Sequence, residues 1–330
     1  MNSSDSTEYL EKIAAIRIKI FNEMSKCVIG QQDIIEKFII ALICKGHCIL
    51  HGLPGLAKTL IISALAKVLN IDFQRIQFTP DLMPSDIIGS EILEENESGR
   101  KSFKFIKGPI FSNIILADEI NRTPPKTQSA LLQAMQEYKV SVFGKTYDMD
   151  LPFFVLATQN PIELEGTYPL PEAQLDRFLF RIEISYPSQE EEIKIASKRN
   201  FYNFQDINSV IDKIELKKIQ DFIEEIPISS KLIEFAVNIV KATRPEYSEI
   251  QDIKSYVRYG AGPRASQFLV ISAKARAALY GKSGVTIDDI KDVVVPVLNH
   301  RIIMAYGAYS AGITSKGVIQ KAIDYAEKKI

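Results

Sequence analysis

Apolar residues along the chain first recur with helical spacing and then gather in short runs. From Tyr9 to Ser25 they stand three and four residues apart, which predicts an amphipathic helix, and Asp33 to Lys45 repeats the pattern. Short runs rich in Ile, Val and Phe then alternate with helical segments. These runs are His47–His51, Phe73–Phe78, Asn113–Ala117, Phe153–Ala157 and Phe178–Ile184. Such alternation predicts a mostly parallel sheet with helices on both faces.

Two further segments have the pattern of β-hairpins. Glu91 to Ile106 contains an Asn-Glu-Ser-Gly turn between two strand-like runs. Lys139 to Leu151 places Gly144 and Lys145 between two others. Both hairpins are expected as additions to the α/β core.

Beyond residue 188 the periodicity is helical. Helices are predicted over Glu190–Arg199, Leu216–Ile226, Ser230–Thr243, Arg264–Tyr280, Ile287–Leu298 and Lys316–Lys328. The change of pattern places a domain boundary after Tyr186-Pro187-Ser188. We therefore expect an α/β domain over residues 1–188 and an all-helical domain over residues 189–330.

Composition limits the class of protein. Hydrophobic residues make up 46% of the 330 and charged residues 25%, which is normal for a globular protein with a buried core. The net charge of −1 argues against a strongly basic nucleic-acid binder. The three cysteines suit a reducing compartment, and neither a membrane span nor a signal peptide is apparent. A cytoplasmic protein is expected.

The strongest chemical signal is the glycine loop from Gly52 to Thr59, between a predicted strand and a helix. Loops of this kind turn backbone N–H groups toward phosphate, and the helix N-terminus adds positive potential. Lys58 would reach the β- and γ-phosphates, and the Thr59 hydroxyl would ligate Mg²⁺. Ala57 stands where a second glycine is usual, which requires its φ to stay negative. The alternative is an ordinary tight turn before a helix.

A second signal is the apolar strand that ends in Asp118 and Glu119. The carboxyl ends of parallel strands form the ligand-binding edge of an α/β sheet. There Asp118 would hold Mg²⁺ through water, and Glu119 would polarise the attacking water.

The run from Cys44 to His51 contains four possible zinc ligands, namely Cys44, His47, Cys48 and His51. It passes from a helix into a strand that must present both faces to apolar neighbours. We therefore favour a packing role over a metal site.

Short motifs stand at residues 28–31 (VIGQ), 52–59 (GLPGLAKT), 118–122 (DEINR), 131–137 (LLQAMQE), 157–161 (ATQNP), 171–178 (PEAQLDRF), 260–265 (GAGPRA) and 297–301 (VLNHR). Together they closely resemble the MoxR family of AAA+ ATPases. The resemblance runs from about residue 10 to the end and keeps the order and spacing of the motifs. It implies a P-loop AAA+ core, with a parallel sheet flanked by helices, followed by a C-terminal all-helical lid.

The resemblance also implies roles for single residues. Asn160 would help to position the attacking water, and Arg264 would be the sensor 2 arginine of the lid. Arg177 would be an arginine finger for a neighbouring subunit, with Arg122 as a second candidate. From the residues alone, a surface ion pair of Arg177 with Asp176 or Glu172 remains the alternative. The residues expected to hold ATP are Val28, Ile29, Gly30, Gln31, Gly52, Leu53, Pro54, Gly55, Leu56, Ala57, Lys58, Thr59, Leu60, Asp118 and Arg264.

The function implied is that of a chaperone-like ATPase that requires ATP and Mg²⁺. It would assemble into a ring, most simply a hexamer, and remodel or activate partner protein complexes, with insertion of metals or cofactors as one form. The partner would be a client protein or a protein with a von Willebrand factor A domain, and the two hairpins would line or face the pore. Two alternatives stay open: a nucleic-acid-stimulated ring motor and a slow nucleotide-dependent scaffold.

Overall fold

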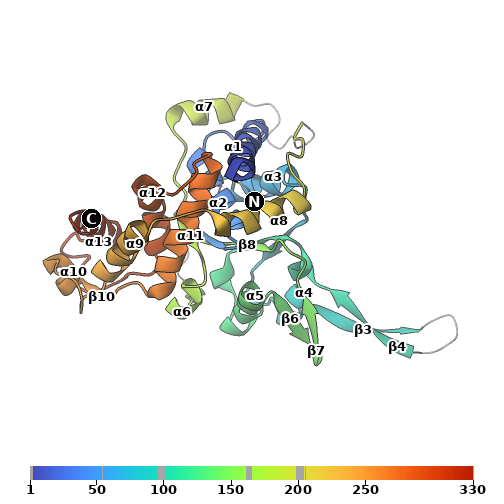
Figure 1. Cartoon of the computed structure of the whole chain (residues 1–330). Coiled ribbons are helices and arrows are strands. Elements are labelled where there is room, and N and C mark those ends of the chain that lie inside the picture. Colours follow the sequence, from blue (N-terminus) through green and yellow to red (C-terminus); the bar gives the residue numbers. More distant parts are fainter. Residues whose placement is uncertain are drawn as a thin grey trace.

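The computed structural model describes residues 3–53, 55–95, 101–160, 166–197, 204 and 206–329. It contains an α/β part and a helical part that lie side by side (Figure 1). Pro54 and the predicted Asn-Glu-Ser-Gly turn at residues 96–99 lie outside the described residues.

A five-stranded sheet forms the centre of the α/β part, with strand order β2-β5-β8-β1-β9. All neighbouring strands are parallel. The strands are β1 (Cys48–His51), β2 (Phe73–Gln77), β5 (Ile114–Asp118), β8 (Phe154–Gln159) and β9 (Phe180–Glu183). Each lies within one of the five predicted runs or extends it by one or two residues, so the predicted parallel sheet is confirmed. The loops that follow β1, β5 and β8 consequently meet at one edge.

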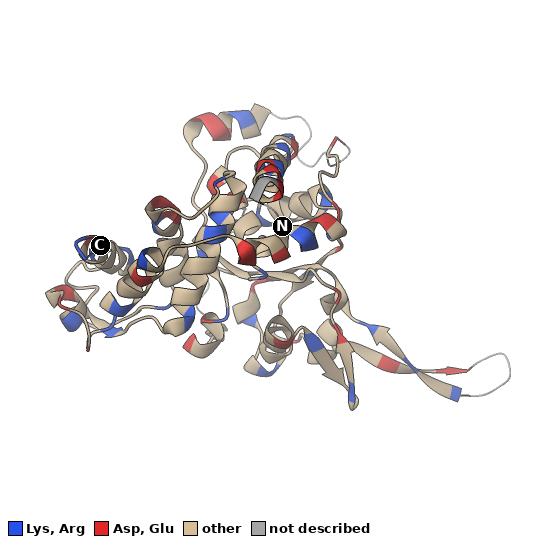
Figure 2. Ribbon diagram, in the orientation of Figure 1, with Lys and Arg blue, Asp and Glu red and all other residues tan. Residues whose placement is uncertain are grey.

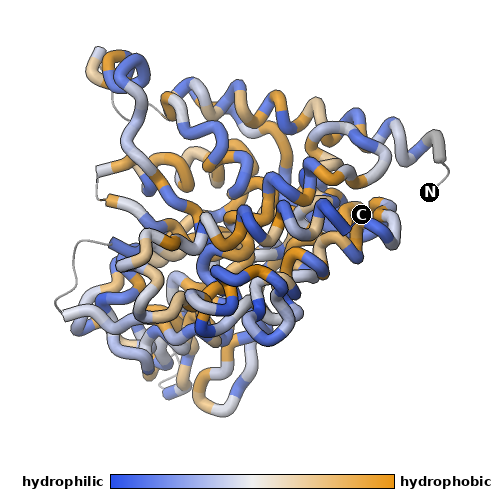
Figure 3. Tube along the Cα trace, turned by 90° about the vertical axis from the view of Figure 1, so that its left-hand side faces the viewer, coloured by the Kyte–Doolittle hydropathy of each residue, from blue (hydrophilic) through white to orange (hydrophobic). Residues whose placement is uncertain are grey.

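Helices cover both faces of the sheet, because alternate strand residues point to opposite sides. Cys48 and Leu50 of β1 belong to one buried cluster, and Ile49 between them belongs to the other. The first cluster includes residues of α1 (Ser3–Ser25), α2 (Gln32–Ile43) and α3 (Lys58–Val68), and the second includes residues of α4 (Pro84–Ile88) and α5 (Pro125–Glu137). Polar and apolar residues alternate along the long helices, as one-sided burial requires (Figure 3).

The helical part continues the first of these two cores. Its elements are α7 (Gln189–Ser197), α8 (Lys213–Glu225), α9 (Ser230–Ala242), α10 (Gln251–Tyr256), α11 (Pro263–Leu279), α12 (Ile287–Leu298) and α13 (Ser315–Glu327). All six predicted helices are present, although the predicted end of the first, residues 198 and 199, lies outside the described residues. Helix α1 packs against both α3 and α11, and α2 packs against α8 and α11, so the N-terminal helices join the two parts.

The expectation of an all-helical C-terminal part is wrong in one detail. Val257–Tyr259 (β10) and Ile303–Met304 (β11) form a short antiparallel pair. Strands of two and three residues are too short to produce a recognisable alternation, so the sequence pattern could not reveal them.

Both predicted hairpins are confirmed. They are formed by β3 (Gly89–Glu95) with β4 (Lys101–Lys107), and by β6 (Lys139–Val142) with β7 (Lys145–Asp148). The second turn is centred one residue earlier than predicted, on Phe143 and Gly144, which both have positive φ as a two-residue hairpin turn requires. The β3–β4 hairpin extends away from the body of the molecule (Figure 1).

The two hairpins contact each other through aromatic rings. Phe105 of β4 stacks on Tyr147 of β7 with ring centroids 4.6 Å apart. The root of the β3–β4 hairpin is a close approach of Gly89 to Gly108, where a Cβ atom on Gly89 would lie 2.6 Å from the Gly108 nitrogen. Only glycine fits at this root.

The remaining short elements are η1 (Pro109–Phe111), η2 (Ile120–Arg122) and α6 (Glu172–Leu175). Within the described ranges, none of the helices is long and apolar enough to pass through a bilayer. Acidic and basic residues are interspersed over the elements (Figure 2).

Candidate nucleotide-binding site

A cavity of about 800 Å³ lies at the carboxyl edge of the sheet. Its size is suitable for a small-molecule ligand. Most of the predicted binding residues line it, namely Val28, Ile29, Gln31, Gly55, Leu56, Ala57, Lys58, Thr59, Leu60, Asp118, Glu119 and Asn160. Gly30 stands between two of these residues in the chain, Gly52 and Leu53 precede Gly55 in the phosphate loop, and Pro54 lies outside the described residues.

The phosphate loop ends in a strained residue. Ala57 has φ 55° and ψ 24°, so the expectation of a negative φ at this position is wrong. The left-handed conformation, which costs an alanine about 1 kcal/mol, ends the loop directly before α3. Ala57 gives α3 no side-chain cap. The first N–H groups of α3 are therefore available to an anion in the cavity.

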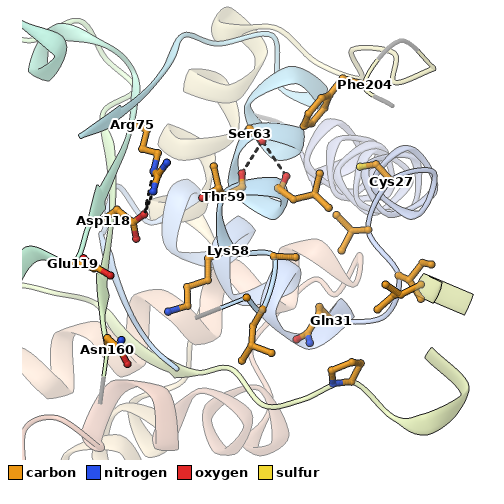
Figure 4. A pocket seen from close by; sticks show the side chains of 18 of the residues that line it. Cys27, Gln31, Lys58, Thr59, Ser63, Arg75, Asp118, Glu119, Asn160 and Phe204 are labelled. Atoms are coloured by element: carbon orange, nitrogen blue, oxygen red, sulfur yellow. Dashed lines mark hydrogen bonds and ion pairs between the residues drawn. The ribbon is translucent and has the colours of Figure 1, made fainter. Parts of the chain in front are cut away.

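Lys58, the first residue of α3, points into the cavity (Figure 4). Its Nζ donates a hydrogen bond to the Gly52 carbonyl oxygen at 2.6 Å. Burial lowers the pKa of Lys58, while the nearby carboxylates of Asp118 and Glu119 oppose that shift. The ammonium group is thus a partly desolvated charge at the place where phosphate oxygens would be bound.

Asp118 ends β5 and is held by two hydrogen-bond donors. The Thr158 hydroxyl donates to Oδ1 at 2.6 Å, and Arg75 donates to Oδ2 from Nη2 at 2.6 Å. Thr158 also accepts a hydrogen bond from the Glu119 backbone N–H at 2.8 Å. This threonine therefore fixes both acids relative to β8.

Glu119 follows Asp118 in a left-handed conformation, with φ 58°. Such a backbone is uncommon for a residue with a side chain and is typical of functional sites. Its Oε2 accepts hydrogen bonds from Gln77 Nε2 and Arg122 Nη1, both at 3.1 Å. Asn160 follows β8 beside β5, as predicted, and Figure 4 shows its amide near the same end of the cavity as both acids.

The opposite end of the cavity is largely apolar. Cys27, Val28, Ile29, Ile195 and Phe204 line it, and Figure 4 places Cys27 and Phe204 on the side away from the acids. An apolar end combined with a cationic and acidic end is suited to a base joined to phosphates. The oxygens of Thr59 and Asp118 are of the kind that Mg²⁺ prefers, so these residues fit the expected metal.

Arg177 and Arg264 are not brought into this cavity. Strands β1 and β9 run parallel, with Cys48 opposite Phe180 and His51 opposite Glu183. The segment before β9 therefore lies at the other edge of the sheet from the phosphate loop. Arg264 Nη1 donates to Asp176 Oδ2 at 2.8 Å, and Arg177 Nη1 donates to the Leu132 carbonyl oxygen at 2.9 Å.

Arg301 binds the same segment from the end of α12, and its side chain is only 2% exposed. Its Nε donates to Asp176 Oδ1 at 2.8 Å, and Nη2 donates to the carbonyl oxygens of Asp176 and Phe178 at 2.8 and 2.6 Å. Its Nη1 also contacts the carbonyl oxygen of Val297. Asp176 thus pairs with Arg264 and Arg301, and the alternative in which it pairs with Arg177 does not occur.

Sequence reasoning did not identify Arg75 and Gln77, although both line the cavity. They stand two residues apart in β2, so they share a face of the strand. This spacing was a usable signal, because two polar residues on one face of a strand in a nucleotide-binding sheet point toward a ligand or another element.

The cysteine and histidine run has a packing role, as expected. His47 Nε2 donates to the Met135 carbonyl oxygen and Nδ1 accepts from the Val155 N–H, both at 3.1 Å. Burial lowers the pKa of His47 to about 4 and raises the pKa of Cys44 and Cys48. Among the described residues, no group of three or more His, Cys, Asp or Glu side chains is arranged to hold a metal ion.

Comparison with known proteins extends the fold assignment. Residues 47–180 match the model of the ATPase family associated with various cellular activities (AAA), and residues 250–321 match the AAA lid domain. The chain is 43% identical to Chaperone MoxR1 of Mycobacterium tuberculosis, covering 91% of this chain and 79% of that protein. It is 40% identical to the uncharacterized protein YeaC of Bacillus subtilis, covering 95% of each. The crystal structure of a candidate ATPase from Cytophaga hutchinsonii matches with a TM-score of 0.90 at 42% identity, covering 98% of both chains.

The parallel sheet, the helical C-terminal part and these two matched models define an AAA+ ATPase fold with a lid. The similarity to MoxR proteins covers most of the chain. Within the AAA+ class the chain belongs to the MoxR family.

Proposed function

We propose that the protein binds Mg²⁺-ATP in the cavity at the carboxyl edge and hydrolyses it. The observation that supports this most directly is that Lys58, Asp118, Glu119 and Asn160 line one cavity with an apolar far end. The chaperone name of the Mycobacterium tuberculosis relative supports a coupling of hydrolysis to partner proteins.

The residues would divide the chemistry as follows. Lys58 and the uncapped N-terminus of α3 would bind phosphate oxygens, and Thr59 and Asp118 would hold Mg²⁺. Bound Mg²⁺ would neutralise part of the phosphate charge. Glu119 and Asn160 would orient and polarise the attacking water, which is the main task left to a protein in phosphoryl transfer.

The positions of Arg177 and Arg264 support a ring. Each lies at the edge of the sheet away from its own cavity, so in our proposal each would serve the ATP of a neighbouring subunit. This proposal changes the role of Arg264, which the sequence suggested would touch the nucleotide of its own chain. A finger of this kind contributes about 10³–10⁵ in rate, so turnover would require assembly, most simply as a hexamer.

In this ring the region of residues 1–188 would hold the nucleotide and residues 189–330 would form the lid. The work of the ring would be to remodel or activate a client complex, with metal or cofactor insertion as one form. A von Willebrand factor A domain protein is the proposed partner. The two hairpins, the most projecting strands, would contact the client.

The nucleotide site is tested by two substitutions. Lys58→Ala should abolish ATP binding, because the lysine contacts phosphate charge in the ground state. Glu119→Gln should keep binding and lose hydrolysis, because the carboxylate acts on water in the transition state. Equilibrium binding of a fluorescent ATP analogue and phosphate release measure the two properties. Equal loss of affinity in both variants would contradict the assignment.

The arrangement between subunits is tested by mixing inactive variants. A Lys58→Ala subunit binds no ATP but keeps both arginines, whereas Arg177→Ala and Arg264→Ala subunits bind ATP but lack one arginine. If both arginines act on the neighbour, Lys58→Ala should restore activity to each of the other two, in proportion to the mixing ratio.

An Arg264 that acted within its own subunit would give no rescue in its mixture while the Arg177 mixture recovered. Mass measurement of the mixed rings must show that subunits exchange. Wild-type turnover by Arg177→Ala alone would instead direct attention to Arg122.

A further inference from the structure

Arg75 engages the carboxylate that would hold the metal. Its guanidinium donates to Asp118 Oδ2 from both Nε, at 3.1 Å, and Nη2, at 2.6 Å. The other oxygen, Oδ1, accepts from the Thr158 hydroxyl. Asp118 therefore has a neutral donor on one oxygen and a cation on the other. Figure 4 shows Arg75 and Asp118 joined at the side of the cavity.

The contact continues from Asp118 to Glu119 through a third side chain. Arg75 Nη2 also donates to Gln77 Oε1 at 2.6 Å, and Gln77 Nε2 donates to Glu119 Oε2 at 3.1 Å. The register of β2 and β5 sets Gln77 opposite Asp118, which brings the amide within reach of Glu119. A chain of hydrogen bonds thus joins the metal-binding carboxylate to the one that would polarise water.

This contact can be exchanged. The Arg75 side chain is 48% exposed, so the guanidinium can turn into solvent, and the less exposed Asp118 keeps the hydrogen bond from the Thr158 hydroxyl. A guanidinium on Asp118 and a divalent cation held at the same carboxylate, directly or through water, repel each other. Binding of one must therefore weaken binding of the other.

We propose that Arg75 is a positioning residue that competes with Mg²⁺ for Asp118. Binding of the metal would thereby change the hydrogen bonds that hold Glu119. This inference rests on the proposed function. When Mg²⁺ displaces Arg75, Gln77 loses the donor that orients its amide, and its hold on Glu119 weakens. Glu119 then becomes free to polarise water only in a site that contains the metal.

The test measures metal binding rather than turnover. Full-length wild type and Arg75→Gln are titrated with Mn²⁺ at a saturating concentration of a non-hydrolysable ATP analogue, and free Mn²⁺ is followed by electron paramagnetic resonance. Arg75→Gln should lower the Mn²⁺ concentration at half saturation about fivefold, the factor that corresponds to loss of one partly exposed ion pair. Arg75→Lys, which keeps the charge with a single donor group, should fall between the two.

Arg122→Gln is the matched control. It removes the same charge beside the cavity, but Arg122 contacts Glu119 and not Asp118. Its effect on half saturation should therefore be less than about twofold, because only the long-range field changes. A circular dichroism melt of each variant checks folding, and a misfolded Arg75→Gln would leave Arg75→Lys to decide the question.

The outcomes separate this inference from the function on which it rests. If the wild type does not bind the ATP analogue, the proposed function fails. If it binds the analogue but Arg75→Gln needs as much Mn²⁺ as wild type, or more, Arg75 does not compete with the metal. If Arg75→Gln and Arg122→Gln change half saturation equally, the effect is one of general charge, and the inference is again overturned.

Discussion

Two aspartates at opposite edges of the sheet are each paired with arginine, yet the pairs differ in burial. Asp118 at the carboxyl edge contacts Arg75, whose side chain is 48% exposed. Asp176 at the other edge contacts Arg301, whose side chain is 2% exposed and also binds carbonyl oxygens of residues 176, 178 and 297. In our proposal the first pair is exchanged for a ligand, whereas the second has buried donors and acceptors that solvent cannot replace.

The first pair belongs to the candidate binding site, whereas the second connects the two parts of the molecule. We call the contacts of Arg301 with Asp176 and Phe178 the joint. Arg301 belongs to the helical part, and the segment that it holds leads from Arg177 into β9. Buried hydrogen bonds therefore tie the lid to the segment that carries the proposed arginine finger. Two neighbouring contacts reinforce this joint, since His300 Nε2 donates to the Phe178 carbonyl oxygen at 3.0 Å and Asn299 Nδ2 donates to Glu183 Oε1 at 3.0 Å.

The largest effect is expected from breaking the buried joint. Arg301→Met should lower the free energy of unfolding by about 3 kcal/mol or more, because it leaves buried carbonyl oxygens without donors. Arg301→Lys should recover only part of this, since an ammonium cannot reproduce the planar fork. Urea denaturation at pH 7 measures both. A loss below about 1 kcal/mol in Arg301→Met would show that the joint is an ordinary surface contact.

Acid should lower the free energy of unfolding through two buried histidines, of which His300 belongs to the same joint and His47 does not. Burial and the adjacent Arg301 hold the pKa of His300 well below its usual range, and burial lowers that of His47 to about 4. The unfolded chain binds protons below about pH 6.5, so stability present at pH 7 is lost as the pH falls through that value. The shift of His47 alone corresponds to a loss of about 2 kcal/mol between pH 7 and pH 5.

Replacing His300 isolates its share of the pH dependence. His300→Gln can still donate to Phe178 but does not titrate, so urea unfolding at pH 7 and pH 5 should give a smaller difference than in wild type. The physical reason is that, among the described contacts, Nδ1 of His300 has no hydrogen-bond partner, and protonation would add a buried donor without an acceptor. An unchanged difference would show that His300 does not contribute.

A smaller effect is expected at the exposed partner of Asp176. The Arg264 side chain is 42% exposed, so Arg264→Ala should lower the free energy of unfolding by less than about 1 kcal/mol while abolishing the proposed activity toward a neighbour. Thermal denaturation measures the change in stability, and ATP turnover of the same preparation measures the loss of activity. Large destabilisation would place Arg264 in the joint with Arg301.

The smallest effect on stability belongs to Arg75. Arg75→Gln should change the free energy of unfolding by no more than about 0.5 kcal/mol, because the Arg75 side chain is half-exposed and Asp118 keeps its hydrogen bond from Thr158. A change above 1 kcal/mol in denaturant titration would make the Arg75 pair structural and would remove the contrast with Arg301.

Periodicity and local motifs were sufficient for the sheet and for most of the cavity. The five strands were predicted from short apolar runs. The functional residues that follow these strands could be placed together because parallel strands end at one edge of the sheet. Lys58 and Asp118 could be placed there because each is next to such a run. These are local properties of the chain.

The features of the structure that were not predicted depend on contacts between segments far apart in the sequence. Nothing near Arg264 in the sequence indicates Asp176, which is 88 residues away and decides that Arg264 lies at the far edge. The left-handed φ of Ala57 was also missed, since an alanine gives no local sign of the turn that the loop imposes. The β10–β11 pair joins segments too short to be detected.

The stacking of Phe105 on Tyr147 has a mechanical consequence. A two-stranded hairpin is marginally stable alone, and here two hairpins brace each other near their roots. Strand β3 has seven residues, which gives a lever arm of about 20 Å from Gly89 to its far end. A rotation of about 10° at that root would carry the far end through about 3.5 Å. Small displacements of the braced root are thus amplified at the part of the molecule that extends furthest from its body.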